Sequence, residues 1–339
     1  TITTTTLTAS TIIVLTSHHW LLVWLALELN TLAILPLIIK RHHPRATEAA
    51  TKYFLIQTTA AALVLFASMM NAWQTGQWNI PNTPSPTTTA LLTAAIMLKL
   101  GLAPAHLWYP EVLQGATLLT ALVISTWQKI APLTLLYLTA HTLPTSLLLL
   151  LGLSSTLIGG LAGLNQTQTQ KIMAYSSIAH MGWLLAAIAL NPSLATLTLM
   201  LYITMTTTLF IALNTTSANT LLDLSTSWSY SPTLIMTTLT ALLALGGLPP
   251  LAGFMPKLLI LKELITTNLM LLGTAMTMAS LPSLFFYTRI MYLTALTMAP
   301  TPTNIKHKWR YKTHHTPHLT TLTMLAALAL PLTPLLYTT

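Results

Sequence analysis

Residues 20–39 read WLLVWLALELNTLAILPLII, and this stretch decides the fold. Twenty mostly apolar residues in an α-helix match the hydrocarbon core of a bilayer, which is about 30 Å thick. Similar apolar runs fill the rest of the chain, and turn-forming segments such as NIPNTPSPTT separate them. The sequence therefore predicts an all-α integral membrane protein with many spans.

The apolar runs predict about eleven transmembrane helices in a single polytopic domain that covers residues 1–339. Their expected ranges are 1–16, 20–39, 53–72, 88–106, 116–138, 145–164, 172–190, 193–214, 233–257, 268–292 and 318–338. Threonine is frequent inside these runs, where its hydroxyl can return a hydrogen bond to the preceding helical turn. No cleavable signal is expected, because the start lacks a basic region and a small-residue cleavage site.

Composition excludes several classes of protein. Only 6% of the 339 residues are charged, against roughly 25% in soluble domains. The chain has no cysteine, so it offers no disulfide, thiolate metal site or iron–sulfur ligand, and redox chemistry is expected in a partner. The net charge of +9 does not indicate nucleic-acid binding, because the basic residues gather in short loops between apolar runs.

The loop charges predict the orientation in the membrane. With eleven spans, nine basic residues fall in loops on one side, and only Lys262 falls in a loop opposite. The nine are Lys40, Arg41, Arg45, Lys52, Lys171, Lys306, Lys308, Arg310 and Lys312. The positive-inside rule then places the N-terminus on the matrix or cytoplasmic side and the C-terminus across the membrane.

Four ionisable residues lie inside apolar runs, and they are Glu28, Lys99, Lys129 and Lys257. A charge at a helix centre costs roughly 2.5 to 3.5 kcal/mol on insertion scales, so such residues normally face the protein interior. One interpretation is a static ion pair between Glu28 and one lysine. However, one acid cannot neutralise three lysines. A buried lysine that water reaches, or that can release its proton, is suited to passing protons.

Glycine and proline interrupt the helices that carry two of these lysines. The residues concerned are Gly101, Pro104, Gly246, Gly247, Pro249 and Pro250. Broken helices are tolerated in a membrane only where the break is buried or lines a hydrated cavity. Paired breaks indicate antiporter-like inverted repeats with a transport site, whereas simple proline kinks are the alternative for either break alone.

His180 lies within an apolar run beside two serines, where a neutral imidazole could accept and release a proton. The alternative is a packing histidine with satisfied hydrogen bonds. His106 borders the first break, but the surrounding APAHLWYP could equally form an aromatic belt at the membrane interface. We therefore rank His106 below His180.

Six motifs resemble the NADH dehydrogenase subunit 2 family of animal mitochondria. They are SHHWLLVWLALELNTLAILP, HHPRATEAATKYFLIQ, LKLGLAPAHLWYPEVLQG, TWQKIAP, GLNQTQTQKIMAYSSIAHMGW and LGGLPPLAGFMPK. The resemblance runs from about residue 17 to the last helix and keeps the order of the motifs. It implies that Glu28, Lys99, Lys129, His180 and Lys257 match the family's intramembrane proton-relay positions.

The resemblance implies a proton-translocating subunit of complex I in the mitochondrial inner membrane, with the N-terminus in the matrix and the C-terminus in the intermembrane space. The expected partners are other membrane-arm and accessory subunits and phospholipid such as cardiolipin. NADH, FMN, iron–sulfur clusters and ubiquinone are expected in partner subunits, with no cofactor or metal on this chain. The alternatives are a standalone cation/proton antiporter and a purely structural membrane subunit.

Overall fold

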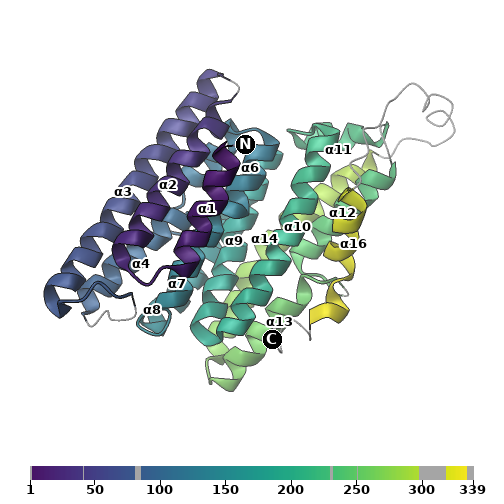
Figure 1. Cartoon of the computed structure of the whole chain (residues 1–339). Helices are drawn as coiled ribbons and strands as arrows, with labels where there is room; N and C mark the ends of the chain where they lie inside the picture. The colour runs from purple at the N-terminus through teal and green to yellow at the C-terminus, as the bar shows by residue number, and fades with distance from the viewer. Residues whose placement is uncertain are drawn as a thin grey trace. The chain divides into compact units, whose positions relative to one another are not determined.

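The computed structural model describes residues 2–40, 42–80, 85–229, 232–249, 251–297 and 318–333, and all its regular elements in these ranges are helical (Figure 1). The α-helices are α1 (Ile2–Thr16), α2 (Trp20–Ile39), α3 (Pro44–Thr75), α4 (Pro86–Leu100), α5 (Trp108–Gly115), α6 (Leu118–Ser125), α7 (Trp127–Thr139), α8 (Thr145–Gly163), α9 (Thr169–Leu190), α10 (Pro192–Thr216), α11 (Leu221–Thr226), α12 (Pro232–Gly246), α13 (Phe254–Thr266), α14 (Met270–Leu296) and α16 (His318–Leu328). Two short 3₁₀ helices are Ser227–Ser229 and Leu330–Leu332.

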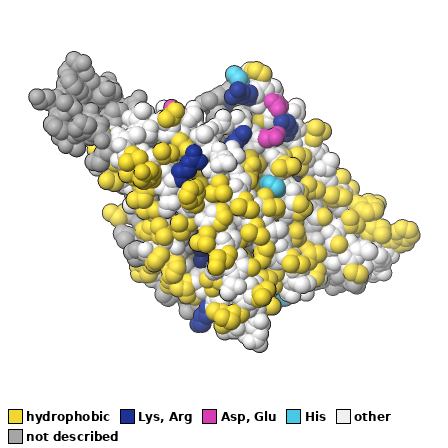
Figure 2. Space-filling view, turned by 180° about the vertical axis from the view of Figure 1, so that it is seen from behind, with side chains coloured by type: hydrophobic (Ala, Val, Ile, Leu, Met, Phe, Trp, Pro, Cys, Tyr) yellow, Lys and Arg dark blue, Asp and Glu magenta, His cyan; other side chains and the backbone are white. Residues whose placement is uncertain are grey.

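The described helices have the length and surface of membrane spans. Seven of them are long and apolar enough to cross a bilayer: α2, α3, α6 with α7, α8, α9, α10 and α14. Three shorter apolar helices, α1, α4 and α12, accompany them. Apolar side chains predominate on the face that Figure 2 shows, where acidic and basic side chains are few. Large apolar residues such as Trp73 and Leu271 are 85% and 86% exposed, as lipid-facing residues are.

Threonine side chains support these helices from within. The Thr58 hydroxyl donates to the carbonyls of Phe54 and Leu55 at 3.0 Å, and that of Thr204 donates to Leu201 at 2.9 Å. The hydroxyl hydrogen is thereby satisfied inside the helix, without water. The predicted role of threonine in the apolar runs is therefore confirmed.

Each of the eleven predicted segments contains a helix, but several limits differ. Helix α3 begins at Pro44 rather than at residue 53, because the His43 side chain accepts from the Arg45 amide and proline suits the first helical turn. Helix α4 ends at Leu100 instead of continuing to residue 106. The segment predicted at 233–257 is divided into α12 and α13, and α13 continues to Thr266.

The segment predicted at 116–138 also contains a break that the sequence did not reveal. Helix α6 ends at Ser125 and α7 begins at Trp127, with Thr126 at φ −111° and ψ −68° between them. The hydroxyls of Ser125 and Thr126 both donate to the Leu122 carbonyl, at 3.0 and 2.7 Å. Such local bonds compete with the regular helical pattern and bend helices.

Packing divides the chain into two compact units, residues 1–151 and residues 152–339. In the first unit, α1, α2 and α3 pack in sequence, and α4 and α5 pack on α3. The start of α2 meets the end of α3, where the Trp20 amide donates to the Trp78 carbonyl at 3.1 Å. In the second unit, α10 packs on α9, α12 and α16, and α13 packs on α9 and α14.

Candidate functional site

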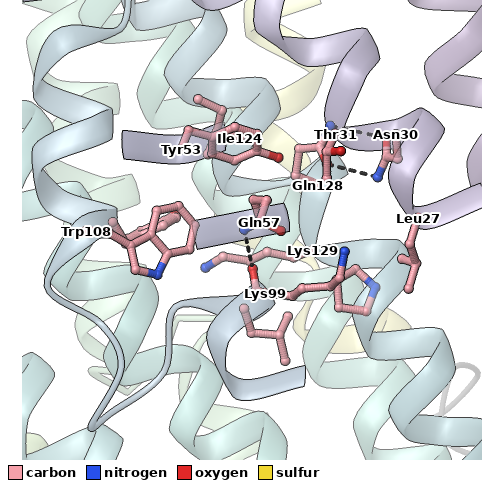
Figure 3. A pocket seen from close by; sticks show the side chains of 13 residues that line it. Leu27, Asn30, Thr31, Tyr53, Gln57, Lys99, Trp108, Ile124, Gln128 and Lys129 are labelled. Carbon is pink, nitrogen blue, oxygen red and sulfur yellow. Dashed lines mark hydrogen bonds between the residues drawn. The ribbon is translucent and has the colours of Figure 1, made fainter. Parts of the chain in front are cut away.

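Two of the predicted lysines share one cavity in the first unit. Lys99, in the last turn of α4, is 6% exposed, and Lys129, in the first turn of α7, is 3% exposed. Both line a cavity of about 20 Å³ (Figure 3). A cavity needs a volume of roughly 10 to 15 Å³ to hold one water molecule, so this cavity has room for one water.

The break after α4 places Lys99 at a helix terminus. Gly101 adopts the left-handed conformation at φ 67°, and its amide donates to the Leu98 and Met97 carbonyls. The Gln57 side chain donates to the Lys99 carbonyl at 3.3 Å. The Lys99 ammonium nitrogen itself is buried and has no hydrogen-bond partner in the described part of the chain.

Glu28 reaches Lys99 electrostatically rather than by contact. Its half-buried side chain on α2 acts on the charge of Lys99 and on the buried Tyr53. No salt bridge joins Glu28 to Lys99, both of which are described, and Glu28 Oε2 is buried without a hydrogen-bond partner. The carboxylate and the ammonium therefore attract each other without direct contact.

Lys129 lies just after the break at Thr126. Its Nζ atom is 4.9 Å from the centre of the Tyr109 ring, a cation–π distance. Tyr109 and its neighbour Trp108 are only 2% and 6% exposed, and both line the cavity. In this structure Trp108 and Tyr109 of the motif APAHLWYP therefore form interior wall, whereas Leu107 is 70% exposed.

The other residues of the first break have no contact with this cavity. Pro104 is exposed, and its carbonyl lies 3.2 Å from Nδ1 of the buried His106. Neither residue lines the cavity that holds the two lysines. The lower rank given to His106 is consistent with this placement.

In the second unit, the Lys257 side chain forms a hydrogen bond across the break between α12 and α13. Its Nζ donates to the Gly246 carbonyl at 2.9 Å, so the side chain satisfies an acceptor that the end of α12 leaves free. Gly247 follows at φ 78°, and a Cβ atom there would lie 2.8 Å from that Nζ. Pro249 is exposed, whereas Pro250 lies outside the described residues.

His180 and Lys257 lie around the same two cavities of the second unit, of about 30 and 10 Å³. His180, on α9, is half-buried, and its ring centre is 5.8 Å from that of Tyr202 on α10. The larger cavity has room for about two waters and the smaller for about one. An imidazole and an amine thus face the same water-sized cavities.

Sequence inspection missed Tyr287 of α14. Its side chain is 1% exposed and lines the smaller cavity with His180 and Lys257. The hydroxyl interacts with Ser176 but has no partner in hydrogen-bond geometry among the described atoms. A tyrosine in an apolar run is indistinguishable from a packing residue, so no sequence signal marked it.

Several charged residues outside these cavities have partners of their own. Lys52 bridges Glu48 and Glu111 at 2.6 and 2.7 Å on an exposed surface of the first unit. Arg289 of α14, also missed in the sequence, donates to the Leu164 carbonyl at 2.7 Å. Asp223 lies in the first turn of α11, where hydrogen bonds from the backbone amide of Thr220 and then from its side chain hold the pKa of Asp223 below its usual value. The contacts of Arg289 and Asp223 are those of helix ends and caps.

Apolar spans with a broken helix and a lysine at the break in each unit define a membrane protein of the antiporter-like class. A family model described as NADH:quinone oxidoreductase/Mrp antiporter, TM matches residues 17–283. A model of the NADH dehydrogenase subunit 2 C-terminus matches residues 284–337. The chain belongs to the NADH dehydrogenase subunit 2 family, as its motifs predicted.

Similarity to individual proteins supports this family assignment. NADH-ubiquinone oxidoreductase chain 2 of Latimeria chalumnae is 54% identical, over 96% of this chain and 93% of the relative. The protein of the same name in Gallus gallus is 52% identical, over 99% and 97%. A chain of respiratory complex I from Thermus thermophilus with bound aureothin is 27% identical, with a TM-score of 0.80 over 97% of this chain and 74% of that one. A chain of the Mrp complex from Dietzia sp. DQ12-45-1b, 17% identical with a TM-score of 0.83 over 98% and 74%, shares the fold.

Proposed function

We propose that this chain is a proton-translocating membrane-arm subunit of respiratory NADH:ubiquinone oxidoreductase. The observation that carries the proposal is the pair of buried lysines, Lys99 and Lys129, around one water-sized cavity. The names of its relatives and the structural likeness to a chain of respiratory complex I support the proposal that this chain is a subunit of that complex.

In the first unit, Glu28 controls the proton on Lys99. Attraction by the carboxylate holds the ammonium form of Lys99, and a change that weakens this attraction lets the proton leave. A water in the shared cavity accepts that proton and gives one of its own to the neutral amine of Lys129. Lys99 ends as the amine, Lys129 as the ammonium, and the water is unchanged.

In the second unit, His180 and Lys257 carry the other half of the relay through bound water. A neutral imidazole can accept a proton on one nitrogen and release another at physiological pH. The Tyr287 hydroxyl faces the same cavity and can accept one hydrogen bond while it donates another. It thereby supplies a link that needs no net change of charge on the tyrosine.

The energy comes from partner subunits, which hold NADH, FMN, iron–sulfur clusters and ubiquinone, while this chain binds no redox cofactor. Moving one charge across 100 mV costs about 2.3 kcal/mol, which a redox reaction can supply. The chain lies in the mitochondrial inner membrane, with its N-terminus in the matrix and its C-terminus in the intermembrane space. It contacts other membrane-arm and accessory subunits, with phospholipid such as cardiolipin along its apolar surface.

The test is Lys129→Ala in the assembled complex of a genetically tractable relative, at the equivalent position. We expect normal assembly with loss of proton pumping and of coupled NADH:quinone activity. Lys262→Ala removes an exposed lysine and is the matched control. Full coupled activity in Lys129→Ala would remove Lys129 from the relay. A defect in assembly that precedes any loss of activity would favour a structural subunit, and failure to purify with NADH-oxidising partners would favour a standalone antiporter.

A further inference from the structure

Two buried amides link α2 to the first turn of α7. Asn30 Nδ2 donates to Gln128 Oε1 at 2.9 Å, and Gln128 Nε2 donates to Asn30 Oδ1 at 3.2 Å (Figure 3). The two side chains are 3% and 9% exposed. Together they form a closed pair in which each amide supplies one donor and one acceptor to the other.

The pair lies in the wall of the lysine cavity. Asn30 and Gln128 line the same space as Lys99 and Lys129. Sequence inspection gave neither amide a role, because a single Asn or Gln in an apolar run carries no charge to mark it. Because both side chains are buried, breaking one side of such a pair leaves the other amide without its protein partner.

The first turn of α7 has little internal support. The residue before it, Thr126, makes no capping hydrogen bond through its side chain to this turn. Pro132, four residues after Gln128, has no N–H to donate to the Gln128 carbonyl. The amide pair therefore supplies a tether that the local backbone lacks, at the residue directly before Lys129.

We propose that Asn30 and Gln128 are positioning residues for Lys129. By tying the kinked start of α7 to α2, the pair fixes Lys129 Nζ beside the cavity and over the Tyr109 ring. The lysine then meets the cavity water in one orientation. Proton transfer depends on such geometry, because both heavy atoms must lie within hydrogen-bond reach. This inference rests on the proposed relay.

The test uses the assembled complex with three sets of substitutions. Gln128→Met and Asn30→Leu each keep approximate size and remove the amide. The double variant Asn30→Leu with Gln128→Met removes both partners, so no amide is left buried and unpaired. The exchange Asn30→Gln with Gln128→Asn keeps both amides and the combined side-chain length.

Both Gln128→Met and the double variant should assemble, pump protons about tenfold more slowly, and show a shifted pH profile of coupled activity. The exchanged pair should restore the rate and the profile. Thr134→Val on the same helix is the matched control, since its hydroxyl bonds only within α7 to Ala131 and faces no described cavity. It should behave as the unaltered complex does.

Two outcomes would overturn the inference. One is a wild-type pumping rate and pH profile in Gln128→Met or the double variant. The other is failure of the double variant to assemble, which would make the pair a purely structural link. Lys129→Ala, measured in parallel, separates the two proposals. If it abolishes pumping while the amide variants pump normally, only the positioning role fails, whereas normal pumping in Lys129→Ala would refute the relay.

Discussion

The buried lysines Lys99 and Lys129 lie at opposite kinds of helix end, which act differently on a positive charge. Lys99 lies in the last turn of α4, where the free carbonyls carry a partial negative charge and attract a cation. Lys129 lies in the first turn of α7, where the free amides repel one, and its observed cationic contact is the Tyr109 ring. The helix ends therefore favour a resting proton on Lys99. In the proposed relay, Lys129 is the residue that receives this proton.

Tyr287 offers a separate test of the second half of the relay. Tyr287→Phe removes one hydroxyl oxygen and leaves the ring packed against Phe286, at 4.4 Å between ring centres. We expect pumping to fall several-fold, because the cavity beside His180 and Lys257 loses its hydroxyl link. Thermal stability in detergent should be unchanged or slightly higher, since the buried hydroxyl has no partner in hydrogen-bond geometry among the described atoms.

The control for this variant is Tyr292→Phe on the same helix, where the side chain is 64% exposed. It should change neither pumping nor stability. Equal pumping by Tyr287→Phe and the unaltered complex would show that the hydroxyl takes no part. A loss of stability in Tyr287→Phe would instead indicate a hydrogen bond, direct or through water, that holds the fold.

At the scale of single residues, the sequence revealed the charged residues of the candidate site but not the neutral polar ones. Glu28 and the three lysines were visible because ionisable residues in apolar runs are rare and costly. Asn30, Gln128 and Tyr287 were not, because neutral polar residues are common in membrane helices as packing or as links between helices. Whether they face a cavity depends on contacts between helices, which the sequence does not display.

At the scale of helices, the break between α12 and α13 works only with glycine at position 247. Its φ of 78° disfavours any side chain, and a Cβ atom would lie 2.8 Å from Lys257 Nζ. Gly247→Ala should therefore displace the lysine from the Gly246 carbonyl and lower pumping by about tenfold or more. The backbone strain adds about 1 to 2 kcal/mol of destabilisation.

Gly76→Ala separates these two effects. Gly76 ends α3 at φ 69°, but a Cβ atom there would meet nothing within 4 Å. It should cause a similar loss of thermal stability with normal pumping. If both variants pumped equally, the contact with Lys257 would have no functional consequence, and backbone strain would account for the whole effect of Gly247→Ala.

Breaks marked by glycine or proline were predictable, and the one at Thr126 was not. Gly101 and Gly247 interrupt α4 and α12 where the sequence places them, since these residue types favour positive φ or lack a donor. At Thr126 the break accompanies side-chain bonds from Ser125 and Thr126 to one carbonyl. Serine and threonine make such bonds in many straight helices too, so their presence alone does not reveal a break.

At the scale of the whole molecule, low charge and apolar length were enough to predict a membrane protein. The division into two compact units was not predictable, because it depends on which helices pack together and not on composition. Within the first unit, the basic residues Lys40, Arg45 and Lys52 lie where α2 ends and α3 begins, and His19 and Trp78 stack at the opposite ends of these helices. The positive-inside rule assigns the basic end to the matrix.

This orientation can be tested on α3 alone. Thr47 and Gln74 are exposed residues near its two ends. They are 27 positions apart in the helix, which corresponds to about 40 Å, more than the hydrocarbon core. The chain has no cysteine, so Thr47→Cys or Gln74→Cys would give this subunit a single reactive thiol. In sealed vesicles with the matrix face outward, a membrane-impermeant maleimide should label the cysteine at 47 and leave the one at 74 unlabelled until detergent is added. The reverse pattern would place the basic end of α3 outside the matrix, so the relay through Lys99 and Lys129 would run against the assumed polarity of the membrane.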